Sequence, residues 1–455
     1  MQRKVVQEIE KWNKKVRRKP LVLLGARQVG KTWLMDEFAR TTYGENVVKV
    51  NFMKSRRLRE VMSHADLAAD TVVENIQLIT GKKIVPGKTL LVMDEIQESP
   101  QALTSLKFFN EDMPELAIIA AGSLLGLSIG KAGENGADNE QRSRGSFPVG
   151  KIDRINVNPM SFSEFLLATG KEMLVELIAQ RNWRKLSCVR EACVEALKAY
   201  LVVGGMPEAV KTYVETGHFD VVRECQETIL ADYDDDFAKH APAALLPKIR
   251  LLWSNIPSQL AKENRKFIYS ALKSGARARE YEMALQWLDD AGMIRQIYRA
   301  DPPRLPLKTY RDFSAFKLYM HDVGLLGAMS GLDPSAVIDG DALFTNFKGS
   351  LTEQYVLQEL IAGGIEPCYW SADAGDAEVE FVVQCRHAVI PVEAKAGINT
   401  KAKSLRVYQM AFAPPFAVRT SLADAHEGQS IKDVPLYAFG SCFEMFQKTA
   451  GGSFL

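Results

Sequence analysis

The sequence predicts an α/β protein whose first region is a parallel β-sheet covered by helices, and three observations support this. Apolar residues at 21–24 lead directly into a glycine-containing loop and then into a segment with helical apolar spacing. A second apolar run, at 89–93, ends in two acidic residues. Further strand-like runs at 47–51, 116–121 and 152–157 alternate with helical or irregular segments. Such alternation is typical of parallel sheets.

The loop after the first apolar run has the spacing G-x-x-x-x-G-K-T. At that spacing, glycines let backbone N–H groups surround the β-phosphate of a nucleoside triphosphate, Lys31 reaches the β- and γ-phosphate oxygens, and the Thr32 hydroxyl binds Mg²⁺. The positive end of a helix predicted over 31–39 adds to this anion site. We therefore predict a P-loop that binds a nucleoside triphosphate and Mg²⁺ through these residues: Gly25, Ala26, Arg27, Gln28, Val29, Gly30, Lys31, Thr32 and Trp33.

Asp94 and Glu95 end the second apolar run. Because parallel strands end at the same edge of a sheet, Asp94 is predicted to lie beside the Mg²⁺ held by Thr32, which makes both residues metal ligands. Glu95 is predicted to orient and polarise the attacking water; the alternative is a carboxylate at a helix start. Lys31, Asp94 and Glu95 are thus predicted to catalyse hydrolysis of the bound nucleotide.

The apolar run at 116–121 is followed by Ser123, which either acts at the γ-phosphate as a catalytic residue or caps the next helix. Residues 124–150 are rich in glycine and predict a mobile loop. Arg142 and Arg144 lie near the end of that loop. If the protein forms a homo-oligomer, either arginine is a candidate to reach the γ-phosphate of a neighbouring subunit; ordinary surface arginines are the alternative.

The composition limits the remaining classes. With 455 residues the chain is long enough for about three domains, and its 47% apolar and 25% charged residues are typical of globular proteins. The net charge of +1 gives no overall attraction to nucleic acid or membranes. Six cysteines without a C-x-x-C pair fit a reducing compartment. No apolar stretch approaches the ~20 residues of a membrane helix, so a cytoplasmic location is predicted.

The first residues predict an amphipathic helix over 3–18, with Val5, Ile9, Trp12 and Val16 on its apolar face. Lysines and arginines gather elsewhere on this helix. The basic face either contacts nucleic acid or simply meets water.

Several segments together resemble prokaryotic ATP-binding proteins of the AAA superfamily that carry a C-terminal domain of unknown function. The segments are 25–32, 91–97, 122–123, 158–165, 200–209, 316–325 and 350–397. The resemblance implies ATP hydrolysis in a first domain, then a helical lid, a winged-helix-like domain and a C-terminal region similar to PD-(D/E)xK nucleases. The corresponding boundaries are 1–160, 161–240, 241–330 and 331–455.

The middle of the chain has helical apolar spacing over 160–240, broken at Gly204-Gly205 and Pro207. This segment is predicted to act as a lid that reports nucleotide state. The acidic run at 232–236 lacks the glycine and the closing glutamate of a calcium loop, so a solvated acidic turn is predicted.

The next segment predicts three helices followed by a two-stranded wing, at 245–260, 267–272, 279–290, 293–298 and 315–319. This is the pattern of many DNA-binding winged helices. Lys273, Arg277 and Arg279 are then candidates for phosphate contacts. A winged helix that contacts protein is the alternative.

The C-terminal region holds a second group of candidate residues. A helix begins near 349 and carries Glu353, a strand at 378–383 carries Glu380, and the next strand carries Glu393 and Lys395. Period-two alternation places Glu393 and Lys395 on the same sheet face. By the resemblance, the three glutamates hold a divalent metal and Lys395 is catalytic, orienting water. Glu380 departs from the usual aspartate, and a hairpin with outward polar residues is the alternative.

Two functions follow from these predictions. The first is an ATP-gated, metal-dependent enzyme acting on nucleic acid, with DNA as its partner. The second is a regulatory ATP switch that binds a protein partner through a nuclease-like fold that no longer cuts.

Overall fold

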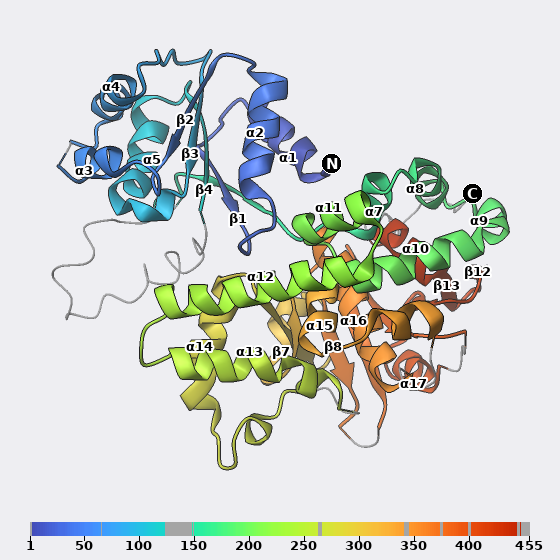
Figure 1. Ribbon diagram of the computed structural model, residues 1–455. Coiled ribbons are helices and arrows are strands. Elements are labelled where there is room, and N and C mark those ends of the chain that lie inside the picture. The colour runs from blue at the N-terminus through green and yellow to red at the C-terminus, as the bar shows by residue number, and fades with distance from the viewer. Residues whose placement is uncertain are drawn as a thin grey trace. The chain divides into compact units, whose positions relative to one another are not determined.

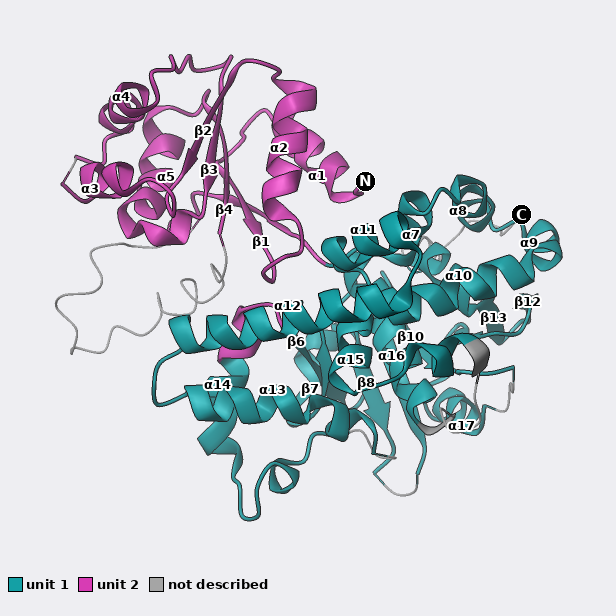
Figure 2. Cartoon of the chain, in the orientation of Figure 1, with its two compact units in different colours: residues 1–2, 159–286, 294–455 teal, residues 3–158, 287–293 magenta. Residues whose placement is uncertain are grey.

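The computed structural model describes residues 2–64, 66–122, 148, 150–262, 266–340, 345–373, 376–398, 402–443 and 446. The chain divides into two compact units, coloured separately in Figure 2. The N-terminal unit comprises residues 3–158 and 287–293, and the C-terminal unit comprises residues 1–2, 159–286 and 294–455.

The N-terminal unit is built on a five-stranded parallel sheet with strand order β2-β3-β4-β1-β5. Its strands are β1 Leu21–Leu24, β2 Val47–Asn51, β3 Leu90–Asp94, β4 Ala117–Ala121 and β5 Asp153–Asn156. Every residue of β3 and β4 is buried, as expected for the centre of a sheet covered on both faces. The predicted parallel sheet is confirmed.

Helices cover both faces of this sheet, as Figure 1 shows. They are α1 Val5–Asn13, α2 Lys31–Thr42, α3 Arg56–His64, α4 Ala69–Thr80 and α5 Pro100–Asp112. Apolar side chains of α3, α4 and α5 form one core with residues of β2, β3 and β4. On the other face α2 packs on β3 and β4 and also contacts α1.

The first helix is shorter than its apolar spacing predicts. It ends at Asn13, and Val16, placed on the apolar face by sequence, is fully exposed. The chain turns back at this point because two side chains hold the turn: Trp12 Nε1 donates to Lys19 O at 2.8 Å, and Arg18 Nη1 donates to Asn13 Oδ1 at 2.7 Å. This turn directs the chain into β1.

The C-terminal unit begins with helices, as predicted for 160–240. They are α7 Phe162–Ala168, α8 Glu172–Ala179, α9 Trp183–Cys188, α10 Arg190–Val203, α11 Pro207–Thr216 and α12 Phe219–His240. The predicted acidic turn at 232–236 is wrong, because these residues lie within α12. Buried Ile229, Tyr233 and Phe237 repeat at helical spacing and hold the acidic run in helical form.

The segment with the winged-helix pattern contains α13 Leu246–Leu260, α14 Ala278–Asp290 and an antiparallel hairpin of β6 Ile294–Ala300 and β7 Arg311–Met320. The helix predicted over 267–272 is wrong, since only a 3₁₀ turn at Tyr269–Ala271 forms there. The hairpin does not stand apart as a wing, because β6 also pairs in parallel with β8.

This pairing makes the hairpin one end of an eight-stranded mixed sheet, ordered β12-β13-β11-β10-β9-β8-β6-β7. The other strands are β8 Cys368–Ser371, β9 Glu378–Gln384, β10 Val389–Ala394, β11 Ala417–Ser421, β12 His426–Glu427 and β13 Ile431–Pro435. Helices α15 Val323–Met329, α16 Thr345–Ala362 and α17 Lys403–Phe412 accompany the sheet, with 3₁₀ segments at Leu307–Tyr310 and Leu436–Cys442 and a π-helical turn at Ala336–Gly340.

Two segments that carry the family resemblance, 200–209 and 316–325, meet at the buried carboxylate of Asp322. It accepts the backbone N–H of Gly205 at 2.6 Å and that of Leu325 at 3.0 Å, and Gln358 Nε2 donates to it at 3.2 Å. A Cβ on Gly204 would lie 2.2 Å from the Asp322 carboxylate, so only glycine fits. Through these hydrogen bonds Asp322 links the turn between α10 and α11 to α15 and α16.

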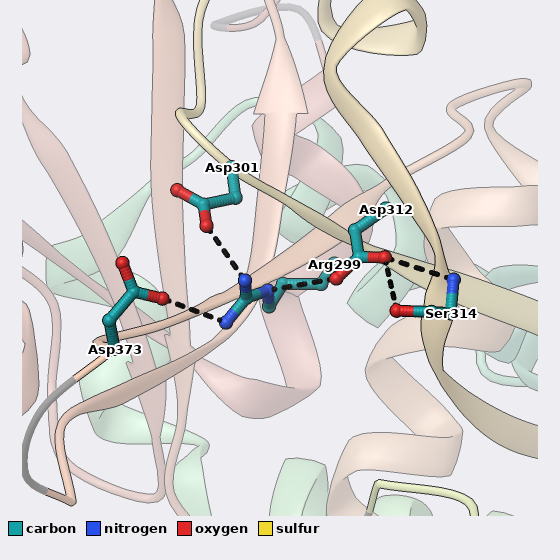
Figure 3. Close-up of polar contacts among 5 residues, drawn as sticks. All are labelled: Arg299, Asp301, Asp312, Ser314 and Asp373. Carbon is teal, nitrogen blue, oxygen red and sulfur yellow. Dashed lines mark hydrogen bonds and ion pairs between the residues drawn. The ribbon is translucent and has the colours of Figure 1, made fainter.

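The guanidinium of Arg299 ties three parts of the same sheet together, as Figure 3 shows. It contacts Asp301 at 2.7 Å, Asp373 at 3.2 Å and Asp312 at 3.4 Å. Asp312 also accepts from the hydroxyl of Ser314 at 2.6 Å. The carboxylates come from the end of β6, from β7 and from the turn after β8, so one side chain links the hairpin to its neighbouring strand.

No helix in the described part of the chain is long and apolar enough to cross a membrane.

Candidate functional site

The P-loop joins β1 to α2, and its backbone adopts conformations that favour glycine. Gly25 has φ of 141° and Gly30 has φ of 92°, while Gln28, with φ of 64°, is a non-glycine residue in the left-handed region. A Cβ on Gly25 would lie 2.2 Å from Val157 O. The first glycine of the motif is therefore required by close packing against the chain that leaves β5, as well as by its φ.

Lys31 is buried at the start of α2, where its ammonium donates to Gly25 O at 2.8 Å and to Ala26 O at 2.7 Å. Burial lowers the pKa of Lys31 to about 8, the charge of Arg27 acts in the same direction, and the carboxylates of Glu95 and Asp94 oppose the shift. The Lys31 side chain thus points back to the carbonyl groups at the start of the P-loop. Trp33, the last predicted residue of the loop, lies on the same helix and is partly exposed.

The Thr32 hydroxyl and the Asp94 carboxylate lie together, as predicted from the ends of parallel strands. Thr32 Oγ1 is 3.3 Å from Asp94 Oδ1 and 3.4 Å from Oδ2. Burial and the charge of Glu95 raise the pKa of Asp94. A hydroxyl and a carboxylate are hard oxygen donors of the kind that Mg²⁺ takes, so the donor set fits this ion.

Asn51 is a site residue that the sequence analysis missed. It ends β2 in register with Asp94, and its Nδ2 donates to Asp94 Oδ2 at 3.1 Å. The available signal was its place at the end of a strand that lies parallel to β3. Asn51 thus fixes the orientation of the carboxylate that faces Thr32.

Glu95 follows β3 in the left-handed region, with φ of 51°. Its backbone N–H donates to Asp94 Oδ1 at 3.1 Å, and Gln97 Nε2 donates to its carboxylate. Glu95 directly precedes the 3₁₀ turn Ile96–Glu98 without a side-chain capping hydrogen bond to it, so the alternative of a carboxylate at a helix start stays open. Ser123, Arg142 and Arg144, the other residues predicted near the γ-phosphate, lie outside the described residues.

In the C-terminal unit, Glu380 on β9 and Glu393 on β10 converge on Lys395. The ammonium of Lys395 is 2.8 Å from Glu393 Oε1 and 3.9 Å from Glu380 Oε1. Burial and the charge of Glu393 raise the pKa of Glu380, while the ammonium of Lys395 opposes this. Glu393 is buried, and its Oε2 has no hydrogen-bond partner among the described residues.

Glu353, the third predicted metal ligand, is buried on α16 and accepts a hydrogen bond from the Tyr319 hydroxyl at 3.1 Å. Within the described ranges, no three or more His, Cys, Asp or Glu side chains are grouped so that they could hold a metal ion. The structure therefore brings Glu380 and Glu393 together with Lys395, but it does not assemble a ligand group of all three glutamates.

Sequence reasoning also missed polar residues beside these acids. Arg419 on β11 pairs in register with Glu393, and its Nε donates to Asp433 Oδ1 at 2.6 Å. On the other side, fully buried Lys317 from β7 pairs with Glu378 on β9. Neither pair has a sequence signal, because each joins residues of different strands and is fixed by how those strands pair.

Comparisons with known families match three parts of the chain. Residues 17–166 match a family described as an AAA domain, while residues 194–336 and 348–439 each match a domain of unknown function. No curated protein matches the sequence.

The solved structures similar to this chain include the following two. A Walker-type ATPase of Pyrococcus abyssi is 15% identical with a TM-score of 0.43, over 71% of this chain and 94% of that one. The ORC1 protein of Aeropyrum pernix, in complex with DNA, is 14% identical with a TM-score of 0.28, over 72% of this chain and 90% of that one. The AAA-domain match coincides with the P-loop, Thr32 and Asp94. Residues 17–166 are therefore similar to an AAA domain and carry the P-loop of an ATP-binding protein.

Proposed function

We propose that this protein hydrolyses ATP and that its nucleotide state controls a metal-dependent nuclease activity of the C-terminal unit on DNA. The observation that carries the first part is the contact of Thr32 with Asp94, 3.3 Å apart, beside Lys31 and Glu95. These are the groups that hold Mg²⁺, contact the phosphates and position water in P-loop hydrolysis.

In this proposal each side chain has a separate task. Lys31 leaves the carbonyl groups of Gly25 and Ala26 and binds the β- and γ-phosphates. Thr32 and Asp94 hold Mg²⁺, with Asn51 orienting the carboxylate. Glu95 orients and polarises the attacking water. Bound to Thr32 and Asp94, Mg²⁺ would supply positive charge beside the phosphate oxygens.

The second part of the proposal rests on the pair Glu380 and Glu393. A buried carboxylate oxygen without a hydrogen-bond partner is costly, and Glu393 Oε2 is such an atom among the described residues. A divalent cation would satisfy it, and Mg²⁺ is commonly held by only one or two carboxylates and several waters. Lys395 then orients the water that attacks the phosphodiester. Exposed Lys273, Arg277 and Arg279 are candidates to contact the DNA backbone.

One observation favours a second function. Lys395 already supplies a positive charge 2.8 Å from Glu393, so the acid pair is partly neutralised by the protein's own side chain. In this alternative the C-terminal unit no longer cuts, and the protein is an ATP switch that binds a protein partner.

The test measures Mg²⁺- or Mn²⁺-dependent cleavage of supercoiled DNA, single-stranded DNA and RNA, with and without ATP. Wild type is compared with Glu393→Ala, Lys395→Ala and Glu95→Gln. Cleavage abolished by the first two substitutions, with its ATP dependence weakened by Glu95→Gln, supports the ATP-controlled nuclease. ATP turnover with no cleavage of any substrate supports the protein-binding switch.

A further inference from the structure

We propose that Arg3 is a positioning residue that transmits the state of the P-loop to the chain segment leading into the C-terminal unit. This inference rests on the proposed binding of ATP at the P-loop. Arg3 is buried, and its guanidinium donates from Nη1 to Val29 O at 3.1 Å and from Nη2 to Asn158 O at 2.7 Å. One planar group thus connects the middle of the P-loop to Asn158, the last residue of the 3–158 segment of the N-terminal unit.

The first connection acts on the part of the loop that surrounds a phosphate. Val29 O belongs to the peptide group whose nitrogen is that of Gly30, one of the two motif glycines. Donation to a carbonyl oxygen polarises the peptide group and strengthens its N–H as a donor. Arg3 therefore supports both the shape and the anion affinity of the loop, while its two fixed donors hold both carbonyl groups in a single geometry.

The start of the loop holds the same segment from another direction. Val157 N donates to Leu24 O at 2.7 Å, and Val157 O leaves no room for a side chain at Gly25. Both Val157 and Asn158 are therefore fixed by the P-loop and by Arg3. A rearrangement of the loop around nucleotide must move these residues or break their hydrogen bonds.

The chain then enters the C-terminal unit at Pro159, whose ring restricts the backbone. Met160 is fixed within the C-terminal unit, because its N–H donates to Gly205 O at 2.6 Å and its carbonyl accepts from the Tyr200 hydroxyl at 2.5 Å. A displacement of Asn158 therefore acts, through the covalent chain, two residues before the backbone hydrogen bond of Met160.

Beyond Met160 the contacts lead to α16. Phe162 N donates to Glu359 Oε1 at 2.7 Å, and Gln358 Nε2 donates to the Tyr200 hydroxyl at 2.9 Å. The same helix carries Glu353, which lies about one and a half turns earlier. Within the C-terminal unit, hydrogen bonds thus link the segment that follows Pro159 to α16.

The experiment uses the full chain and the non-hydrolysable analogue AMP-PNP with Mg²⁺. Binding affinity is measured by calorimetry, and hydrogen exchange is followed at the amides of 160–162 with saturating nucleotide. In wild type we expect nucleotide to slow exchange at these amides. Arg3→Lys keeps the charge but loses the two-pronged donation, so we expect AMP-PNP to bind about tenfold more weakly and protection at 160–162 to fall by at least half at saturation.

Two further variants make the result specific. Pro159→Ala lies outside the nucleotide site and should leave AMP-PNP affinity within about twofold of wild type while reducing protection at 160–162. Lys11→Ala, an exposed basic residue on α1, should match wild type in both measurements. Circular dichroism establishes that each variant is folded, and Pro159→Ala tests the connection if Arg3→Lys does not fold.

The outcomes separate this inference from the proposed function. If wild type does not bind AMP-PNP, the proposed ATP site itself is wrong. If wild type binds the nucleotide but exchange at 160–162 does not change, or if Arg3→Lys and Pro159→Ala both keep full protection at saturation, the coupling role of Arg3 is wrong and the ATP site stands.

Discussion

The ammonium of Lys395 lies 2.8 Å from Glu393 Oε1, at the centre of the acid pair of the C-terminal unit. A cation in this position competes with a divalent metal for the same carboxylate, because like charges in a partly buried site repel strongly. The lysine proposed to assist cleavage is therefore also expected to weaken metal binding.

We predict that Lys395→Met increases Mn²⁺ affinity about tenfold while it abolishes cleavage. Removal of the ammonium leaves both Glu393 oxygens to the metal but takes away the group that orients water. Calorimetric titration with Mn²⁺ measures the affinity. Lys403→Met, at the exposed start of α17, is the matched control and should leave it unchanged. Weaker Mn²⁺ binding by Lys395→Met would mean that the lysine supports the metal site.

We predict that ATP binding takes up protons near pH 8 because of Lys31. Its pKa is about 8 without nucleotide, below the usual 10.5, since burial disfavours the ammonium. Phosphate charges favour the ammonium and raise this pKa in the complex. Between the two pKa values binding therefore takes up a proton, and ATP affinity falls as the pH rises above 8.

Calorimetry in buffers of different ionisation enthalpy measures this uptake. Lys31→Arg keeps a charge that does not titrate, so its uptake should disappear at nucleotide concentrations that still give binding. Lys88→Met changes an exposed lysine and should keep the wild-type uptake. Equal uptake by wild type and Lys31→Arg would assign the proton to another group.

We predict that Asn51→Ala lowers the rate of ATP hydrolysis about tenfold and changes ATP affinity little. The substitution removes the 3.1 Å hydrogen bond that orients Asp94, and a hydrogen bond to a charged group contributes roughly 1.5–3 kcal/mol. Steady-state kinetics separate kcat from KM. Asn46→Ala alters an exposed asparagine just before β2 and serves as the control. A KM effect alone would place Asn51 in nucleotide binding.

We predict that Arg299→Ala destabilises the C-terminal unit by about 1–2 kcal/mol, more than a single surface pair, because three carboxylates lose one shared partner. Because salt screens ion pairs, the difference in unfolding free energy between wild type and Arg299→Ala should become smaller when salt is added. The pKa of Asp312 lies below its usual 3.8. The main cause is the hydrogen bond from the Ser314 hydroxyl, and the charge of Arg299 adds a smaller contribution. Its contribution to stability is therefore present above about pH 4 and is lost as the pH falls through the lowered pKa.

Urea unfolding at several salt concentrations and between pH 3 and 7 tests this prediction. Arg304→Ala, an exposed arginine in the loop between the same two strands, is the control. If Arg299→Ala and Arg304→Ala are equally stable at low salt, the contacts of Arg299 contribute no net stability.

Sequence alone was sufficient where the signal is local. The spacing from Gly25 to Thr32 and the acids after 89–93 predicted the P-loop and the neighbour of Thr32, because parallel strands must end at one edge of their sheet. Period two likewise predicted that Glu393 and Lys395 share a face. The helix at 3–18 was predicted too long because apolar spacing does not detect the side-chain hydrogen bonds that turn the chain after Asn13.

Only the tertiary structure decided the contacts between residues that are far apart along the chain. It placed Asn51 on Asp94, Arg3 on both Val29 and Asn158, and the predicted wing at the end of an eight-stranded sheet. It also directed Glu353 to Tyr319. The physical reason is that motif spacing reports local backbone geometry, whereas these partners are selected by how separate strands and helices pack.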